Sequence, residues 1–508
     1  MLASALVFFG FAGAANADTG SPLEKLAAAH PDRTVEVIAQ LREGVSPLGA
    51  RSVVAAHDGR VTKDLHIING FGAQLDAADA LELVDDPRVE HVSLNAAVEP
   101  QAIDTRQLQT AYPPSAGAPS VWNQMGYTGK GVGVAIVDTG IDGSLPDFQV
   151  SKTDTTSRVV ASVVTNPLAK NVNDEYGHGT HVAGILAGNG TNRSDTLAGR
   201  YIGTAPEANL ISIKADDGAG NATILDVIYG IQFAVDHKDT YNIRVLNLSL
   251  ESTVAQSYKT DPLDAAVESA WLKGIVVVAA AGNRGTAKDA VSYAPGNDPF
   301  VISVGAVNDG GTTAGGDDVA ASWSSRGTTQ DGFAKPDILA PGASIVSTLA
   351  PNSAFTKLCS TCVVSGQYFR AGGTSMAAPV VSGVAAMLIE KYPNITPNQV
   401  KGMITALYRT VPGALDEVAA GKVLQANPSQ YTANQGLTPN TLVSSTTGDI
   451  DYTRSSWSRS SWSTAPEQLI ADWARSSWSC NCSLTSSGSV DPTRSSWSRS
   501  SWSTSWKL

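Results

Sequence analysis

The sequence predicts an α/β protein. Its central, mainly parallel sheet is covered by helices on both faces, preceded by a small α+β unit and followed by an irregular C-terminal tail. Three observations support this prediction. Between residues 121 and 424, short apolar strands alternate with helical stretches. Residues 34–99 carry a separate pattern of strands and short helices. Residues 450–508 are rich in Ser, Arg and Trp but poor in aliphatic side chains.

Length and charge narrow the possibilities further. The chain has 508 residues, which is too long for one typical domain. It is 42% hydrophobic and 16% charged, as expected for a globular protein. The net charge of −12 argues against nucleic acid as a partner, because phosphate binding needs clustered Lys and Arg. The acidity is compatible with calcium ligation but indicates no site.

The N-terminus has the pattern of a signal peptide. An apolar run from Leu2 to Ala15 ends in Ala15-Asn16-Ala17, a typical small-residue cleavage site. No Lys or Arg precedes Lys25, so a start further upstream is compatible with the sequence, and a buried N-terminal helix is the alternative. No later apolar run approaches the ~20 residues that a membrane span needs. We expect residues 1–17 to be removed and the product to be secreted and extracellular.

Residues 18–104 form the expected N-terminal unit. A strand is predicted at 34–41, where apolar and polar residues alternate, and a helical stretch follows. A second strand is predicted at 66–75, a helix at 76–84 with Asp76 as N-cap, and a third strand at 89–94. A proline-containing linker at 99–119 leads to the next unit.

The large unit spans residues 105–425, and the tail spans 426–508. Strand–helix alternation in the large unit predicts a parallel sheet covered on both faces. The expected strands lie at 132–137, 209–213, 245–248, 275–279 and 300–304. The expected helices lie at 179–187, 224–236, 262–273, 375–392 and 396–406.

Three motifs place a reactive side chain beside glycine at the end of a predicted element. Asp138, followed by Thr-Gly, lies at the carboxyl end of a buried strand, the edge at which open α/β sheets build their sites. His178 opens a helix within His-Gly-Thr-His-Val-Ala-Gly. Ser375 opens another helix within Gly-Thr-Ser-Met-Ala-Ala-Pro.

Together these motifs supply an acid, a base and a nucleophile. Serine becomes an effective nucleophile when a neighbouring imidazole removes its proton. A carboxylate on the far side of the imidazole fixes the tautomer and stabilises the charged form. Backbone N–H groups at a helix N-terminus favour a developing oxyanion. Asn283, shortly after a buried strand, is a candidate for a further oxyanion donor.

In this order, the motifs resemble the signature blocks of the subtilisin family. The likeness covers about residues 121–425 and includes secondary blocks at 279–283 and 333–342. It implies a three-layer subtilisin-like fold and a serine endopeptidase that needs no cofactor for its chemistry. It also implies roles: Asp138 orients, His178 is general base and then acid, Ser375 attacks, and Asn283 and the Ser375 N–H bind the oxyanion.

The resemblance further implies a cleft in which an extended peptide is added as a β-strand. The matching segments are Gly218-Ala219-Gly220 and Ser249-Leu250-Glu251, with Gly282 beside them. Many relatives carry glycine at the position of Glu251, so we expect this residue to narrow the primary pocket or to favour basic side chains. The loop 188–203 is a poor match to the best-known calcium loop of the family, so a structural calcium ion stays unassigned.

Residues 18–104 resemble the inhibitor-like propeptide of subtilases, through 37–41 and 91–94. This likeness implies a zymogen whose propeptide serves as a folding template and intramolecular inhibitor and is removed by self-cleavage. The cut is expected within 99–112, and the substrates of the mature enzyme are expected to be proteins or peptides.

Each motif has a simpler interpretation when taken alone. Asp138-Thr139-Gly140 also occurs in aspartic proteases, but only one strong copy is present. His178 and His181 have the spacing of a metal pair, but the glutamate of the His-Glu-x-x-His pattern is absent, and His181 is expected to be structural. Ser375 could be a helix N-cap and Asn283 a turn residue. No Gly-x-Ser-x-Gly motif of an α/β-hydrolase occurs.

The four cysteines form two close pairs, Cys359/Cys362 and Cys480/Cys482. In an exported protein they predict disulfides, for which three connectivities are open. A four-cysteine zinc site is the alternative.

The tail repeats Arg-Ser-Ser-Trp-Ser five times, beginning at Arg454, Arg459, Arg475, Arg494 and Arg499. Arg beside Trp could stack on carbohydrate, on a surface polymer or on another protein, and a disordered or removed segment is the alternative. A second hypothesis for the whole chain is therefore a catalytically silent scaffold of the same family that binds surfaces through this tail.

Overall fold

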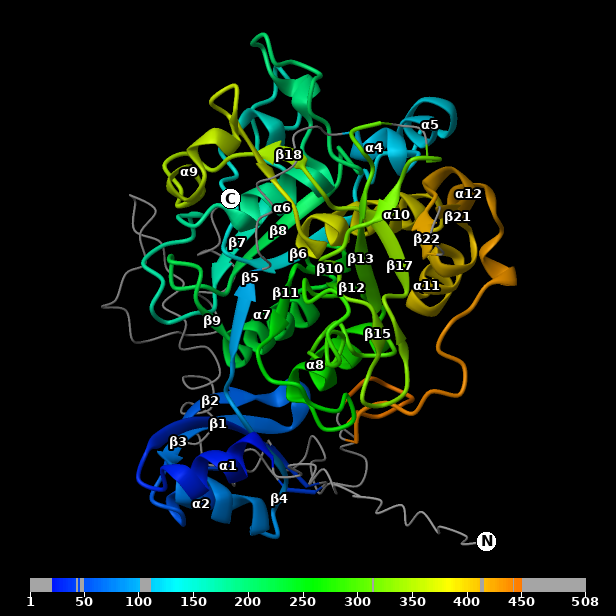
Figure 1. The fold of residues 1–508 in the computed structure, drawn as a ribbon. Coiled ribbons are helices and arrows are strands. Elements are labelled where there is room, and N and C mark those ends of the chain that lie inside the picture. The colour runs from blue at the N-terminus through cyan, green and yellow to red at the C-terminus, as the bar shows by residue number, and fades with distance from the viewer. Residues whose placement is uncertain are drawn as a thin grey trace, which may run out of the picture.

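A computed structural model describes residues 21–42, 44–45, 50–100, 111–312, 315–411, 415–441 and 443–449. These residues form a small N-terminal unit that lies against a larger one (Figure 1). The expected signal peptide, the Arg-Ser-Ser-Trp-Ser repeats and the pair Cys480/Cys482 lie outside the described residues. Within them, every helix is either too short or too polar to cross a membrane.

The small unit is a four-stranded antiparallel sheet in the order β2-β3-β1-β4, with three short helices. Its strands are β1 (Thr34–Leu41), β2 (Arg60–Leu65), β3 (Gly70–Asp76) and β4 (Val89–Leu94), and its helices are α1 (Pro22–Ala29), α2 (Ala50–Ala55) and α3 (Ala77–Glu82). Side chains of a strand alternate between the two faces. Accordingly Val37 and Ala39 pack into the core of the small unit, whereas Ile38 packs into the core of the large unit. The sheet therefore joins the two units through its second face.

Two predictions for the small unit are wrong in detail. The strand expected at 66–75 begins only at Gly70, because His66–Ile68 form a 3₁₀ turn that ends at Asn69 with φ 46°. Asparagine tolerates this left-handed backbone better than most residues. The stretch expected to be helical contains a helix, α2, but also the strand β2, which was not expected. Its Val61 and Thr62 favour a strand, but the polar neighbours hid the alternation.

The large unit contains a ten-stranded sheet in the order β21-β22-β17-β13-β12-β10-β6-β8-β7, with β14 paired to β13. All neighbours from β22 to β7 are parallel, and only β21 and β14 pair antiparallel, so the prediction of a mainly parallel sheet is confirmed. The strands are β6 (Gly133–Asp138), β7 (Val159–Val164), β8 (Asn209–Lys214), β10 (Ile243–Leu248), β12 (Val276–Ala280), β13 (Ile302–Asn308), β14 (Val319–Ala320), β17 (Ile338–Pro341), β21 (Tyr408–Val411) and β22 (Leu415–Val418).

Helices cover both faces of this sheet, giving three layers. Gly230 of α7 lies against Val137, whereas Gly179 of α6 lies against the neighbouring Asp138. Successive residues of a strand point to opposite faces, so α6 and α7 lie on opposite sides. Helix α10 packs with α6, and α8 packs with α7. The helices of the large unit are α4 (Tyr112–Ser115), α5 (Ala118–Ser120), α6 (His178–Ala187), α7 (Ile224–Asp236), α8 (Pro262–Leu272), α9 (Phe355–Leu358), α10 (Thr374–Lys391), α11 (Pro397–Ala406) and α12 (Ala420–Gln425).

The chain continues to pack on the large unit beyond α12. The Asn440 N–H donates to Glu268 at 2.6 Å, and the Ser269 hydroxyl donates to the Gly448 carbonyl at 2.8 Å. The Tyr258 hydroxyl donates to the Thr438 carbonyl at 2.9 Å. The described residues of the segment 426–449, which the sequence analysis placed in the tail, therefore belong to the large unit, and those from 438 onward pack on α8 and on the residues just before it.

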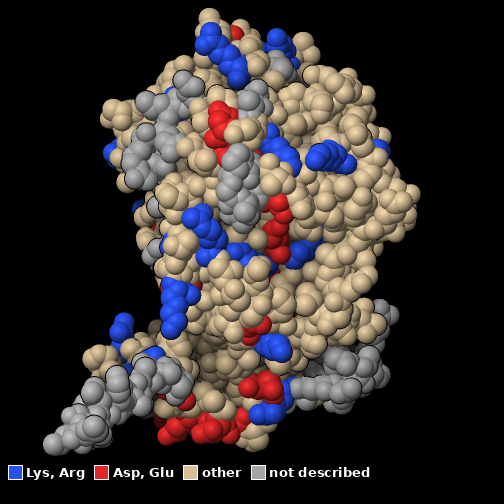
Figure 2. All heavy atoms as spheres, turned by 45° about the vertical axis from the view of Figure 1, so that its right-hand side comes forward, with Lys and Arg blue, Asp and Glu red and all other residues tan. Residues whose placement is uncertain are grey.

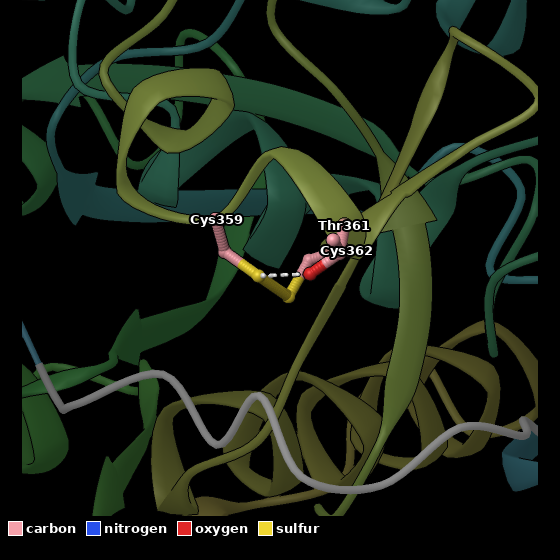
Figure 3. The surroundings of a disulfide bond; sticks show 3 residues. All are labelled: Cys359, Thr361 and Cys362. Carbon is pink, nitrogen blue, oxygen red and sulfur yellow. Dashed lines mark hydrogen bonds between the residues drawn. A yellow bond between two sulfur atoms is a disulfide. The ribbon is translucent and has the colours of Figure 1, made fainter.

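Cys359 and Cys362 form a disulfide between α9 and β19 (Val363–Val364) (Figure 3). Cys359 Sγ also lies 3.4 Å from the Thr361 hydroxyl. The expected disulfide chemistry is thus confirmed for this pair. The four-cysteine zinc alternative is wrong, because both sulfur atoms of the first pair are bonded to each other.

Charged side chains are unevenly spread over the molecule. Figure 2 shows the densest group of acidic side chains at the lower end, where the small unit lies in Figure 1, and further Asp, Glu, Lys and Arg scattered over the rest of this face. This face offers no broad basic surface of the kind that binds a phosphate backbone.

Candidate active site

The first part of the site joins the end of β6 to the start of α6. Asp138 is the last residue of β6 and His178 the first residue of α6, and both are buried. His178 Nδ1 lies 2.7 Å from Asp138 Oδ1. The Thr139 N–H donates to the same carboxylate oxygen at 2.8 Å. His178 Nε2 is buried and has no partner among the described residues. A carboxylate on Nδ1 places the ring proton there and leaves Nε2 as an acceptor.

Two buried charged residues hold the loops that carry this pair. Asp174 accepts hydrogen bonds from the N–H groups of Gly177 and Thr180 at 2.6 and 2.7 Å and from the Thr139 hydroxyl at 2.8 Å. It therefore ties the start of α6 to the loop after β6. Lys214 Nζ donates to the carbonyls of Thr139 and Asn173, at 3.0 and 2.6 Å. The sequence analysis missed both residues, because Asp174 lies three residues before the N-cap Gly177 and Lys214 lies on a different strand, where no local pattern marks them.

The second part of the site is the start of α10. Ser375 is buried, and its hydroxyl donates to the Ser249 carbonyl at 3.0 Å. The Ser249 hydroxyl donates in return to the Ser375 carbonyl at 2.8 Å. Among the described residues, no hydrogen bond joins Ser375 to His178. The structure thus brings Ser375 to the end of β10 and Asp138 to His178, with α6 packed on α10.

Asn283 lies in the loop after β12 and faces the start of α10. Its Oδ1 accepts hydrogen bonds from the Thr374 N–H at 3.0 Å and from the Thr374 hydroxyl at 3.1 Å. These bonds orient the amide, and its Nδ2 is buried without a partner among the described residues. A fixed N–H donor beside the residue that precedes Ser375 is compatible with the oxyanion role expected of Asn283, which stays a prediction.

The pKa values of the two histidines move in opposite directions. Burial lowers the pKa of His178, but the Asp138 carboxylate, with smaller effects from Asp174 and Asp216, outweighs it and raises the pKa above its ordinary value. Burial lowers the pKa of His181 to about 3. His181 is therefore neutral, and its Nε2–H donates to the Phe369 carbonyl at 2.9 Å. This environment is that of a structural histidine.

An extended segment of the chain itself lies beside the site. Strand β5 (Ala97–Pro100) pairs antiparallel with β11 (Leu250–Ser252) on one side and with β9 (Ala222–Thr223) on the other. In this register Pro100 lies opposite Leu250. Pro100 therefore lies opposite the residue that follows Ser249, whose carbonyl accepts the Ser375 hydroxyl.

The structure places the remaining predicted substrate-binding residues around this strand. Glu251 lies on β11, and a Cβ on Gly282 would come within 2.3 Å of its Oε2, so Gly282 makes room for this side chain. Gly218 and Gly220 lie in a turn whose N–H groups donate to Asp216, at 3.0 and 2.9 Å. The segment that pairs with β5 is β9, which begins two residues after this turn. A direct contact of Gly218-Ala219-Gly220 with substrate stays a prediction.

Glu251 is paired with a cation. Arg284 Nε donates to Glu251 Oε1 at 3.1 Å, and the guanidinium stacks on the Tyr293 ring, 4.0 Å from its centroid. The expected preference for basic substrate side chains assumed a carboxylate available to the substrate. The ion pair with Arg284 removes that basis and leaves the narrowing of the pocket as the remaining prediction.

The described residues do not fit a calcium ion in the loop 188–203. The carboxylates available there are those of Asp147 and Asp195, and both bind Arg193. No cluster of three His, Cys, Asp or Glu side chains suited to a metal ion occurs in the part of the chain that the structure describes.

A model of the subtilase family matches residues 129–421, which include all three motifs. The chain belongs to the subtilase family, a family of serine proteases. Among its curated relatives is the serine protease AprX of Bacillus subtilis, 39% identical over 302 residues. That alignment covers 58% of this chain and 65% of AprX, slightly less than two thirds of the relative's length.

Another subtilase matches a larger share of the chain, and a solved structure confirms the fold. Subtilisin E of Bacillus subtilis is 34% identical over 378 residues, covering 73% of this chain and 84% of the relative. The crystal structure of fervidolysin from Fervidobacterium pennivorans, a keratinolytic enzyme related to subtilisin, superposes with a TM-score of 0.59 at 24% identity. This superposition covers 78% of this chain and 61% of fervidolysin, and it confirms the three-layer subtilisin-like fold.

Proposed function

We propose that this subtilase is a secreted serine endopeptidase, made as a zymogen that processes itself, with Asp138, His178 and Ser375 as its triad. The observation that carries the proposal is the position of β5. This strand of the N-terminal unit lies between β9 and β11 as an added strand, and its last residue, Pro100, pairs with Leu250, which follows the Ser249 that accepts the Ser375 hydroxyl. A substrate bound in the same way would present its scissile bond there.

The chemistry begins with a change of partner by Ser375. Rotation of its side chain releases the Ser249 carbonyl and brings the hydroxyl to His178 Nε2, which has no other partner among the described residues. As Ser375 Oγ attacks the substrate carbonyl carbon, its proton passes to His178 Nε2. Asp138 stabilises the imidazolium through Nδ1–H. The raised pKa of His178 supports its role as proton acceptor.

The electrons of the carbonyl bond move onto oxygen, where two donors are available. These are Asn283 Nδ2 and the Ser375 N–H at the start of α10. Collapse of the tetrahedral intermediate breaks the C–N bond, and His178 gives its proton to the leaving amine. Water then attacks the acyl-enzyme by the same steps and releases the carboxylic acid and Ser375.

Secretion and inhibition by the N-terminal unit rest on separate features. The apolar run at residues 2–15 and the disulfide Cys359–Cys362 both favour export to an oxidising compartment. Lys63 of the N-terminal unit forms an ion pair with Asp226 of α7 at 2.6 Å, and the Leu225 N–H donates to Asn95 at 3.0 Å. These contacts support a unit that inhibits by occupying the cleft. The intact acid–base pair and the oriented Asn283 amide count against a catalytically silent scaffold.

Expression of the full chain and of its Ser375→Ala variant tests the proposal. We expect the wild-type chain to lose its N-terminal unit by a cut within 99–112 and the variant to retain it, as read from intact masses after export. Identical trimming of both chains would show that another protease performs the maturation and would remove self-processing from the proposal.

A further inference from the structure

The loop that the resemblance to subtilases would lead one to examine for calcium contains a buried arginine. The Arg193 side chain is only 3% exposed. One terminal nitrogen donates to Asp147 Oδ2 at 2.6 Å, and Nε donates to Asp195 Oδ1 at 3.1 Å. The other terminal nitrogen contacts Asp195 Oδ2 and Gln367 Oε1. The guanidinium also lies 5.4 Å from the centroid of the Tyr368 ring.

A second buried arginine, Arg158, binds the main chain of the same region. Its terminal nitrogens donate to the carbonyls of Asp147, Ala187 and Ala208 at 2.7–2.8 Å. Its Nε donates to the Gln149 carbonyl at 3.3 Å. Arg193 thus binds the carboxylate of Asp147, and Arg158 binds its main-chain carbonyl.

These acceptors are the kinds of oxygen that Ca²⁺ takes in proteins, namely carboxylates, side-chain amides and main-chain carbonyls. Here these oxygen atoms instead accept hydrogen bonds from the guanidinium groups of Arg193 and Arg158. Arg193 binds Asp195 through two nitrogens, the fork geometry in which arginine is strongest. A guanidinium keeps its charge at every pH at which a protein is folded.

We propose that Arg193, supported by Arg158, is a built-in cation that replaces a metal ion in holding the loop 188–203. This part of the subtilase is then independent of calcium. The charges of Asp147 and Asp195 are already balanced, and the site offers no free carboxylate to a divalent ion. A calcium ion entering here would have to displace Arg193 and leave a buried guanidinium without partners, which is strongly unfavourable.

The first test compares melting temperatures in EDTA and in millimolar calcium chloride. All chains carry Ser375→Ala to prevent autolysis. We expect Asp195→Asn, which removes one acceptor of Arg193 at a partly exposed position, to leave the calcium response of the parent unchanged. An ion bound elsewhere in the chain would raise the melting temperature of both chains equally. A calcium-dependent rise in the parent that Asp195→Asn abolishes would overturn the proposal.

The second test removes the cation itself. We expect Arg193→Ala to lower the melting temperature in EDTA by about 5–10 °C, because it leaves two carboxylates facing each other. Part of this loss should return on addition of calcium, since the ion now finds free carboxylates and stabilises the folded chain by mass action.

Arg244→Ala is the matched control for this variant. The Arg244 guanidinium donates to the carbonyls of Pro393 and Ile395, at 2.6 and 3.0 Å, so its removal frees no carboxylate. We expect it to destabilise the chain without any gain in calcium response. If Arg193→Ala gains no more calcium response than Arg244→Ala, Arg193 does not act as the substitute for a metal ion.

Discussion

Two regions of this acidic chain bury carboxylates in opposite ways. At the loop 188–203, the Arg193 guanidinium neutralises the charges of Asp147 and Asp195. We call these two aspartates, joined by Arg193, the arginine-bridged pair. On the other side of the sheet, Asp264 and Glu268 of α8 lie with Asp261 and Asp298 at 0–1% exposure, and we call these four residues the α8 acid cluster. Both Asp264 oxygens, Glu268 Oε1 and Asp298 Oδ2 lack partners among the described residues.

The α8 acid cluster is balanced by protons rather than by cations. Burial, with the nearby Asp298 carboxylate, raises the pKa of Asp261 to about 7 and that of Glu268 to about 11, and burial alone raises that of Asp298 to about 6. It also raises the pKa of Asp264 well above its ordinary value. The cations that face the cluster, Lys335 and Lys401, lie on the Asp298 side. The comparison shows that buried acids can be balanced by an internal cation that stays charged, or by bound protons that are lost as the pH rises through the raised pKa values.

The largest effect is expected from breaking the arginine-bridged pair. Asp147→Ala leaves the guanidinium of Arg193 buried without one of its two carboxylate partners. Such a loss typically lowers the free energy of unfolding by about 3–5 kcal/mol. Because a guanidinium does not titrate, this loss in the free energy of unfolding should be nearly the same at pH 5 and at pH 8. Urea unfolding of the Ser375→Ala background measures it, and a loss confined to one end of the pH range would contradict the account.

The α8 acid cluster should instead make stability depend on pH. Each carboxyl has a raised pKa in the folded chain, so the folded state holds more protons than the unfolded state above about pH 4. Stability from the cluster is full below that pH and is lost as the pH rises toward 7 and beyond.

Asp264→Asn replaces a carboxyl that takes up a proton on folding by a neutral side chain of nearly the same shape. At pH 8 it should raise the free energy of unfolding by about 1–3 kcal/mol, whereas near pH 4 the variant and the parent should agree. Urea unfolding of both chains at both pH values measures the difference, and equal stabilities of variant and parent at pH 8 would show that proton uptake by Asp264 does not oppose folding there.

The smallest effect is expected from an ion pair at the surface. Lys273 contacts Asp449 at the end of the segment that covers α8, with side chains 23% and 50% exposed. Solvent screens such a pair, so Lys273→Ala should change the free energy of unfolding by less than about 1 kcal/mol. A larger loss in the same urea measurement would mean that this contact anchors the covering segment and controls access of water to the α8 acid cluster.

The sequence predicted those features that reside in local patterns. Asp138, His178 and Ser375 each stand in a short motif at an element end, and the structure places each of them there. Alternating strands and helices likewise predicted the parallel sheet.

Features that depend on distant partners escaped prediction. Arg193 donates hydrogen bonds to Asp147, 46 positions away in the sequence, and to Gln367, 174 positions away. No local sequence pattern marks such contacts. The pairing of β5 depends on two short edges, β9 and β11, that have little strand character of their own. The ion pair between Arg284 and Glu251 was not predicted either, because these residues are also far apart in the sequence.

The most direct test of the central claim, that Ser375 is a nucleophile activated by His178 and Asp138, is labelling of the exported chain with a fluorophosphonate probe. The account predicts one labelled residue, Ser375, located by peptide mass spectrometry. It also predicts that labelling is lost in Ser375→Ala and slowed by orders of magnitude in His178→Ala. Labelling at full rate in His178→Ala, or at a different serine, would contradict it.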